Sequence, residues 1–203
     1  MNASALPPSA PPDPIALFLA DRERARAAGE GWEATAAALA TVKPGGLPSA
    51  RFVLVKEAAQ DGFRFYTNRR SQKAAELEAV PHAALAFLWT KIDVQFRIEG
   101  PVRSLDEAAS DAYFASRPRI SQLGAWASHQ SEPLGSREEL LGRLAELEKK
   151  YPEGTTVPRP PHWGGYLLTP ARIEHWRAAP FRLHERTLYE RDGAGWRAQL
   201  MNP

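Results

Sequence analysis

The chain has 203 residues and a mass of 22.4 kDa, and its content of 43% hydrophobic and 25% charged residues is that of an ordinary globular protein. A net charge of only +2 leaves no dense basic stripe, so a dedicated nucleic-acid binder is not expected. The sequence contains no cysteine, which excludes disulfides, thiolate metal ligands and a cysteine nucleophile. Any redox chemistry must therefore come from a bound cofactor.

The first residues of the chain differ in composition from the rest. Residues 1–12 are rich in Pro, Ala and Ser, and we expect a disordered tail there, followed by a single domain over residues 13–203. The beginning of the chain has no basic segment followed by an apolar one, and the longest apolar run, residues 83–89, is too short to span a membrane. We expect a cytoplasmic protein that does not bind membranes.

Regular structure is predicted to begin at Asp13, as an N-cap, with Pro14 at the first helical position. This helix runs to about residue 29 and places Ile15, Phe18 and Leu19 on one face. Residues 35–42 are apolar enough for a buried strand, and the turn residues at 43–46 lead into a hairpin.

The hairpin is predicted from two β-rich runs, residues 51–55 and 63–67, with Asp61 and Gly62 as the turn. A short helix over residues 72–77 follows. Basic and hydroxyl side chains at this point, together with free N–H groups of the helix start, predict a site for an anion of phosphate size: Arg51, Thr67, Arg69, Arg70, Ser71 and Lys73. The alternative is a surface hairpin with solvated charges.

Two strands and a helix are predicted in the middle of the chain. Residues 82–89 form a strand, and from residue 93 apolar and polar residues alternate, so that Gln95 faces away from the apolar side. Ser104 and Glu107 form a capping box for a helix to residue 116, which Pro118 stops. The following segment, RPRISQLGAWASHQS at 117–131, is a polar and aromatic mixture typical of pockets or interfaces.

Ser136 and Glu139 form a second capping box, for an amphipathic helix to about residue 150. Short strands are predicted at 166–168, 172–177, 187–191 and 195–200. These short strands, interrupted by three helices, do not give the alternating pattern of a parallel sheet. We predict a β-rich α+β fold, an antiparallel barrel with flanking helices.

Common nucleotide and hydrolase motifs are absent from the sequence, so a bound nucleotide would be held by side chains. The five histidines lack metal-ligand spacing, and no metal site is predicted. If residues 182–186 form a strand, Arg182, His184 and Arg186 share one face and suit an anionic or electron-rich ligand. The alternative is an ion-pair face with Glu185 and Glu190.

Several blocks occur in the order and approximate spacing of bacterial pyridoxamine 5'-phosphate oxidases: RFVLVK, FYTN, SQK, RPRISQLGAWASHQS, HWGGY and RLHER. The chain resembles this family from about residue 13 to residue 203. The resemblance implies an FMN-binding split β-barrel, a homodimer, and oxidation of pyridoxine 5'-phosphate or pyridoxamine 5'-phosphate to pyridoxal 5'-phosphate, with dioxygen reduced to hydrogen peroxide.

The resemblance also implies roles for individual residues, among which Arg51 and Lys73 would hold the FMN phosphate and Gln95 the flavin ring. Gln130, Ser131, Trp176 and Arg186 would reach FMN from the partner subunit. The implied cofactor-binding set is Arg51, Phe52, Val53, Leu54, Val55, Lys56, Tyr66, Thr67, Gln72, Lys73, Gln95, Gln130, Ser131, Trp176 and Arg186. The implied substrate-binding set is Lys56, Tyr113, Arg117, Ser121, Arg182, Leu183 and His184, with Arg182 and His184 as the catalytic pair over the substrate ring.

Three departures from the family bear on these roles. Gln72 stands where many members have Arg, so Arg69 or Arg70 would have to compensate at the FMN phosphate. Residues 177–179 replace a segment that usually carries glycines, and Glu185 replaces the usual Asp. The Arg-rich N-terminal segment that closes over the substrate in some members is missing.

Two other functions stay open on the sequence. One is an FMN oxidase of another small ring compound, such as those of phenazine biosynthesis, and the other is a non-catalytic flavin or pyridoxal-phosphate carrier. An enzyme whose substrate lacks a phosphate would have little use for Lys56 and Arg117. These two positions therefore separate the first alternative from the oxidase of phosphorylated pyridoxine.

Overall fold

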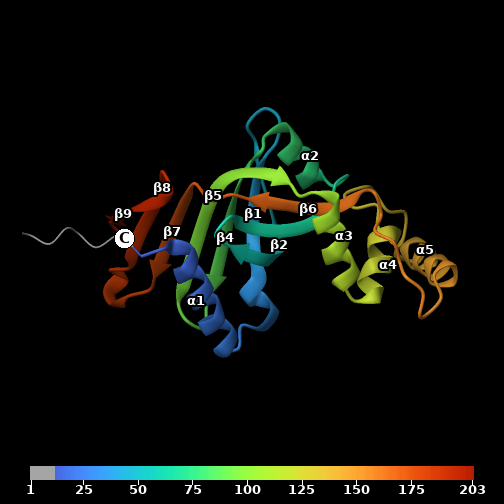
Figure 1. The fold of residues 1–203 in the computed structure, drawn as a ribbon, viewed down its shortest axis with the longest axis horizontal. Helices are drawn as coiled ribbons and strands as arrows, with labels where there is room; N and C mark the ends of the chain where they lie inside the picture. The colour runs from blue at the N-terminus through green and yellow to red at the C-terminus, as the bar shows by residue number, and fades with distance from the viewer. Residues whose placement is uncertain (1–11) are drawn as a thin grey trace, which may run out of the picture.

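A closed antiparallel barrel forms the centre of the computed structural model, which describes residues 12–203 (Figure 1). Neighbouring strands pair in the order β4-β1-β2-β3-β6-β5, and β4 pairs with β5 to close the ring. The barrel strands are β1 (Ala36–Val42), β2 (Pro48–Ala59), β3 (Gly62–Asn68), β4 (His82–Trp89), β5 (Val94–Ser104) and β6 (Trp163–Leu168). The prediction of an antiparallel split barrel is confirmed.

Three further strands extend the sheet beyond the barrel on one side. The first part of β5 pairs with both β4 and β7, whereas its last residues pair with β6. One strand thus belongs to the barrel and to the extension. The added strands are β7 (Arg172–Arg177), β8 (Glu185–Asp192) and β9 (Gly195–Met201).

Helices flank the barrel: α1 covers one end, and α3 to α5 lie together on the side away from β7 to β9 (Figure 1). The side chain of Asp13 accepts from the N–H of Ile15 at 2.9 Å and that of Ser136 from Glu139 at 3.3 Å, so both predicted caps are confirmed. The helical segments are α1 (Pro14–Ala27), η1 (Gly31–Thr35), α2 (Gln72–Ala79), α3 (Glu107–Ser116), α4 (Arg119–Ala127), α5 (Arg137–Lys150) and η2 (Pro180–Arg182).

The barrel core is closed by an aromatic side chain from α1. The ring of Phe18 is fully buried, with its centroid 4.9 to 5.3 Å from the rings of Phe63, Phe87, Trp89 and Phe96. Aromatic pairs at such distances contribute about 0.5 to 1.5 kcal/mol each beyond their buried area. A second hydrophobic cluster lies under α3 and α4 and consists of Phe114, Leu123, Val157 and Trp163.

The segment over 117–131 contains the helix α4. Two local predictions were wrong. The N-cap of α3 is Asp106, whose side chain accepts from the N–H of Ala109 at 2.7 Å, so Ser104 belongs to β5 instead. Residues 182–184 are not part of a strand, because η2 precedes β8 and both Phe181 and Arg182 have positive φ, at 58° and 63°.

The tail predicted over residues 1–12 lies outside the described residues except for Pro12. Within residues 12–203, no helix combines the length and the apolar character needed to cross a membrane.

Candidate functional site

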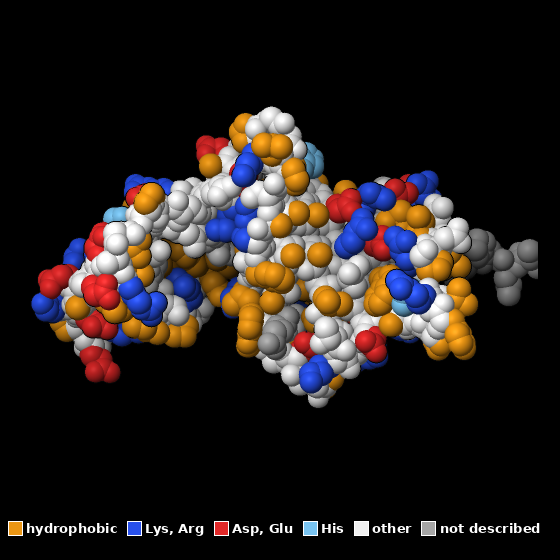
Figure 2. All heavy atoms as spheres, turned by 180° about the vertical axis from the view of Figure 1, so that it is seen from behind, with side chains coloured by type: hydrophobic (Ala, Val, Ile, Leu, Met, Phe, Trp, Pro, Cys, Tyr) orange, Lys and Arg blue, Asp and Glu red, His pale blue; other side chains and the backbone are white. Residues whose placement is uncertain are grey.

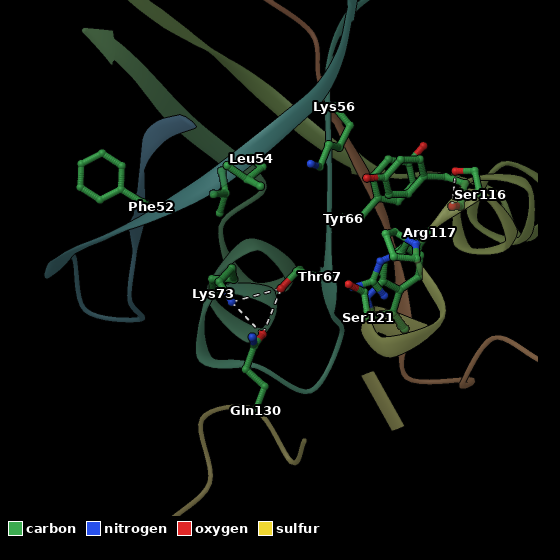
Figure 3. A pocket seen from close by; sticks show the side chains of 14 residues that line it. Phe52, Leu54, Lys56, Tyr66, Thr67, Lys73, Ser116, Arg117, Ser121 and Gln130 are labelled. Atoms are coloured by element: carbon green, nitrogen blue, oxygen red, sulfur yellow. Dashed lines mark hydrogen bonds between the residues drawn. The ribbon is translucent and has the colours of Figure 1, made fainter. Parts of the chain in front are cut away.

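A cavity of about 530 Å³ opens between the barrel and the helices α3 and α4 (Figure 3), a volume suited to a small-molecule ligand. Its walls come from β2, β3, the start of α2, the end of α3, α4, the segment after α4 and the start of β6. The lining residues are Phe52, Val53, Leu54, Lys56, Tyr66, Thr67, Lys73, Tyr113, Ser116, Arg117, Pro118, Ser121, Gln130 and Trp163. Most of them belong to the cofactor and substrate sets predicted above.

A β-bulge in β2 places Lys56 at this cavity. The pairing with β3 shifts between Val55, which lies opposite Phe65, and Glu57, which lies opposite Arg64. Lys56 is therefore the extra residue, and it and Glu57 both project away from the core although they are neighbours in a strand. Regular alternation would point Glu57 inward, at the cost of burying a carboxylate.

At one end of the cavity, Lys73 donates to three side-chain oxygens, and Figure 3 shows the bonds to Thr67 and Gln130. Its Nζ lies 3.1 Å from Thr67 Oγ1, 3.2 Å from Ser71 Oγ and 3.0 Å from Gln130 Oε1. Burial, with a smaller effect of the positive charge of Arg51, lowers the pKa of Lys73 to about 8. No carboxylate of residues 12–203 forms an ion pair with Lys73, so an anion in the cavity would stabilise its charged form.

Lys56 and Arg117 also line the cavity, away from Lys73 (Figure 3). Burial lowers the pKa of both, and the charge of Arg117 further lowers that of Lys56. Arg117 Nη1 is buried and has no hydrogen-bond acceptor, and within the described chain neither cation pairs with a carboxylate. Two like charges that repel each other and lack a counter-ion make a site for an anion.

A stack of aromatic rings forms the wall beside these cations. The ring of Tyr66 lies 3.9 Å from that of Tyr113 and 5.4 Å from that of Trp163, with interplanar angles of 18° and 8°. The sequence did not assign a role to Trp163, nor to Ser116 and Pro118, which also line the cavity. The only signal for Trp163 was its place in the HWGGY block.

Arg51, predicted to bind the FMN phosphate, does not line the cavity. Its Nη2 donates to Glu76 Oε2 at 2.8 Å and to Ser49 Oγ at 2.7 Å, and its Nη1 donates to Thr41 Oγ1. Gln72 likewise donates to Glu76, at 2.8 Å. The Glu76 carboxylate, on α2, thus binds both Arg51 and Gln72. Arg51 acts on Lys73 only through its charge, which lowers the pKa of Lys73.

Arg69 and Arg70, the residues expected to compensate for Gln72, do not reach this end of the cavity either. Arg69 donates to Glu107 at 2.6 Å and packs against Gly164, whereas Arg70 is exposed and does not line the cavity. The four basic residues therefore do not converge on one point of this structure. Among the four, Lys73 alone lines the cavity.

Glu76 is an anchor for this region, and its removal is expected to lower the free energy of unfolding. Its side chain is 3% exposed, and although burial favours the neutral form, hydrogen bonds from Thr41, Gln72 and Arg51 lower its pKa to about 2. Glu76→Gln leaves the partly buried Arg51 without a counter-charge, which costs about 2 kcal/mol at pH 7.

The effect of Glu76→Gln should depend on pH. The folded-state pKa lies below the ordinary value of 4.5, so the carboxylate stabilises the fold above about pH 4.5 and loses this contribution as the pH falls toward 2. Urea unfolding of the wild type and of Glu76→Gln at pH 7 and pH 3 measures the difference in their free energies of unfolding. If this difference is as large at pH 3 as at pH 7, the ion-pair explanation is contradicted.

Gln95, Trp176 and Arg186 form a row across β5, β7 and β8 instead of lining the first cavity. Gln95 pairs with Trp176, and Trp176 with Arg186. Arg186 Nε donates to Glu174 Oε1 at 2.9 Å, and its Nη1 donates to the carbonyl of Asn202 at 2.9 Å. Direct pairing puts the three side chains on one face of the sheet.

A second cavity, of about 450 Å³, adjoins the first because Phe52 lies in the walls of both. Gln95 lines it together with apolar residues that include Trp32 and Leu88. Phe52 is 77% exposed and Trp32 67%. Figure 2 shows hydrophobic side chains gathered over the middle of one face, beside a group of Lys and Arg side chains.

The predicted catalytic residues lie apart from both cavities in this chain. Arg182 and Leu183 are exposed, and the ring of His184 lies 4.6 Å from that of Trp176. The N–H of Ala179 donates to Nδ1 of His184 at 3.3 Å. The neutral imidazole therefore carries its proton on Nε2, which makes that atom a hydrogen-bond donor.

Comparison with protein families identifies this arrangement. The family model described as pyridoxamine 5'-phosphate oxidase matches residues 23–151, and the model described as pyridoxine 5'-phosphate oxidase C-terminal dimerisation region matches residues 163–203. The chain belongs to the pyridoxamine 5'-phosphate oxidase family. The resemblance inferred from the sequence blocks is confirmed.

Curated relatives of this family cover nearly the whole chain. A pyridoxine/pyridoxamine 5'-phosphate oxidase of Anaeromyxobacter dehalogenans is 55% identical over 198 residues, which are 98% of this chain and 99% of the relative. One of Rubrobacter xylanophilus is 54% identical over 194 residues, 96% of this chain and 88% of the relative.

Among solved structures, PhzG from Burkholderia lata in complex with tetrahydrophenazine-1-carboxylic acid has a TM-score of 0.89 and 33% identity, covering 98% of both chains. A pyridoxamine 5'-phosphate oxidase-related, FMN-binding protein from Nostoc punctiforme, at 22% identity and a TM-score of 0.74 over 98% and 99% of the two chains, shares the fold.

Gln130 and Ser131 are positioned differently from what the family resemblance implied. Both were expected to serve the site of a partner subunit, but Gln130 contacts Lys73 and Thr67 of its own chain, and Ser131 Oγ accepts from the N–H of Gln72 at 3.1 Å. No second chain is needed to bring these two residues to the Lys73 end of the cavity.

Proposed function

We propose that this family member is an FMN-dependent oxidase that converts pyridoxine 5'-phosphate or pyridoxamine 5'-phosphate to pyridoxal 5'-phosphate and reduces dioxygen to hydrogen peroxide. Relatives that are 51 to 55% identical over nearly the full length bear the name of this enzyme. The observation that carries the choice of a phosphorylated substrate is the pair Lys56 and Arg117, which face one cavity without a carboxylate partner among residues 12–203.

The cavity fits FMN at the end where Lys73, Thr67 and Gln130 meet. Lys73 supplies a half-buried positive charge and Thr67 a hydroxyl, the donors that a phosphate requires, and Ser131 lies next to the first residue of α2. Phe52 connects this space to the second cavity, where Gln95 would meet the ring system. A flavin held by Lys73, Thr67 and Gln95 would supply the redox chemistry, namely removal of a hydride equivalent from C4' of the substrate and reduction of dioxygen to hydrogen peroxide.

The part of the protein in the reaction is to bind and orient. Lys56 and Arg117 would hold the substrate phosphate by charge-assisted hydrogen bonds, with Ser121 and Tyr113 beside them. A phosphate fixed at several points leaves the substrate ring few orientations. Orientation of this kind can lower a barrier by roughly 7 kcal/mol or more.

We also propose that two copies of the chain assemble and that Arg182 and His184 of one copy reach the cavity of the other. Both residues lie apart from the cavities of their own chain, on a segment whose Phe181 is 93% exposed. The family model over residues 163–203 is described as a dimerisation region. Gel filtration should give twice the chain mass of 22.4 kDa; elution as a monomer with full activity would contradict the assembly.

FMN affinity is expected to fall at alkaline pH because Lys73 has a pKa of about 8. A bound phosphate raises the pKa of Lys73, so affinity is full below pH 8 and decreases about tenfold per pH unit above it, until the pKa of the complex is reached. Titration of the protein with FMN, followed by quenching of flavin fluorescence between pH 6.5 and 9.5, measures this. An affinity independent of pH would exclude Lys73 as a phosphate ligand.

The function is tested by adding pyridoxine 5'-phosphate to the FMN-loaded protein without oxygen. We expect the band of oxidised flavin to disappear while pyridoxal 5'-phosphate forms. Unphosphorylated pyridoxine is the matched control, because it lacks only the group that Lys56 and Arg117 would bind. Flavin that stays oxidised with both compounds would refute the proposed oxidase and leave a flavin-binding protein or an oxidase of another ring compound.

A further inference from the structure

Trp163 occupies a central place in the cavity wall that the reaction described above does not use. It is the first residue of β6, its side chain is 6% exposed, and its ring contacts those of Tyr66 and Phe114 at 5.4 and 5.1 Å. The guanidinium carbon of Arg117 lies 4.9 Å from the Trp163 ring centroid and 5.6 Å from that of Phe114. The indole is therefore the nearer of two aromatic surfaces that support this arginine.

The contacts of Arg117 differ from those of other partly buried arginines in residues 12–203. Arg51 and Arg159 are fixed by carboxylates, Glu76 for the first and Asp111 for the second. Arg117 has no carboxylate partner within residues 12–203, and its Nη1 is buried without an acceptor. A carboxylate would compete with an incoming anion for the guanidinium, whereas an aromatic face attracts the cation and leaves its in-plane N–H groups free.

The position of Trp163 is itself fixed by its neighbours. Arg159 Nη1 donates to the Trp163 carbonyl at 2.5 Å. Two residues further, a Cβ at Gly165 would lie 2.7 Å from Cε1 of Tyr66, the ring that stacks on Trp163. The absence of a side chain at Gly165 lets the tyrosine ring lie flat against β6, which explains the second glycine of the HWGGY block.

We propose that Trp163 is the positioning residue for Arg117: the indole holds the guanidinium at the cavity without neutralising it and so sets the preference for a phosphorylated substrate. This inference rests on the proposed function, since it takes Arg117 as the ligand of the substrate phosphate.

The test is a double-mutant cycle in the FMN-loaded protein, with Trp163→Leu, Arg117→Ala and the double variant. Trp163→Leu should raise the KM for pyridoxine 5'-phosphate about tenfold, within the range of a partly desolvated cation–π contact, with kcat changed less than twofold. In the Arg117→Ala background the same substitution should change KM less than twofold. Trp163→Phe, which keeps an aromatic face, should recover most of the wild-type KM.

The matched control is Val157→Ala, which loosens the same hydrophobic cluster without contact to the cavity. It should lower the midpoint of urea unfolding while KM stays within twofold of the wild type. Equal effects of Trp163→Leu with and without Arg117 would overturn the proposal, because they would mean that the indole acts on the substrate or on the fold and not through Arg117.

Calorimetric titration with pyridoxal 5'-phosphate separates this inference from the proposed oxidation. If wild-type protein binds the phosphorylated ring but does not oxidise pyridoxine 5'-phosphate, the proposed function fails while the same cycle, measured on the dissociation constants, still tests Trp163. If the two substitutions have additive effects on the binding free energy, the positioning role is rejected independently of any turnover.

Discussion

Arg117→Ala is expected to raise the KM for pyridoxine 5'-phosphate by two to three orders of magnitude while FMN stays bound. Arg117 lines the cavity, its Nη1 is buried without an acceptor, and no carboxylate within residues 12–203 forms an ion pair with it. Loss of two charge-assisted hydrogen bonds costs about 3 to 4 kcal/mol in total. Steady-state kinetics over a wide substrate range, with the flavin spectrum as a check of cofactor content, measures the change.

Arg103→Ala is the matched control for this variant. Arg103 is exposed on β5 and does not line the cavity, so its loss removes one positive charge from the surface and should leave KM within about twofold. An unchanged KM in Arg117→Ala would show that the substrate phosphate binds elsewhere. Equal effects of the two variants would point to a general attraction of anions by the charge of the protein.

Lys73→Met should weaken FMN binding about 100-fold. Lys73 is the cation among Thr67, Ser71 and Gln130, and Arg51 is held by Glu76 instead of facing the cavity. Because methionine keeps much of the apolar stem, the variant removes the charge with little loss of packing. Fluorescence titration with FMN at pH 7 gives the dissociation constant, and the decline in affinity above pH 8 should vanish in the variant.

Arg70→Met tests whether an arginine near Lys73 contributes to the same site. Arg70 is exposed three residues away and does not line the cavity. Its substitution should change the FMN dissociation constant by less than threefold. A loss as large as that of Lys73→Met would mean that Arg70 turns toward the phosphate when FMN binds and compensates for Gln72 after all.

Much of the fold could be predicted because its signals are local. Asp13 before Pro14 and Ser136 before Glu139 mark helix starts through hydrogen bonds within a single turn. The alternation from Val94 to Glu99 shows which face of β5 is buried. Where two local signals compete the prediction failed: both Ser104 and Asp106 can cap a helix, and the extension of β5 through Ser104 decided for Asp106.

The candidate site was predictable in part. Lys56, Tyr113, Arg117 and Ser121 were named from the sequence blocks and line one cavity, and Gln95, Trp176 and Arg186 share a face. Arg51 was assigned to the FMN phosphate by the family resemblance, in agreement with the anion site inferred from the basic and hydroxyl residues around the start of α2. Its buried partner Glu76 lies 25 residues further along the chain, and no local pattern links the two.

The sequence by itself determined the helix caps at Asp13 and Ser136, the alternation of β5 and the antiparallel class of the fold, because each depends on neighbours within a few positions. Only the tertiary structure decided which cations remain free. Glu76 pairs with Arg51, Glu107 pairs with Arg69, and the bulge at Lys56 keeps Glu57 on the outside of the barrel. The rings of Trp163 and Phe114 support Arg117 without a counter-charge. The physical reason is that the pairing of buried charges depends on distances in space between segments far apart in the chain.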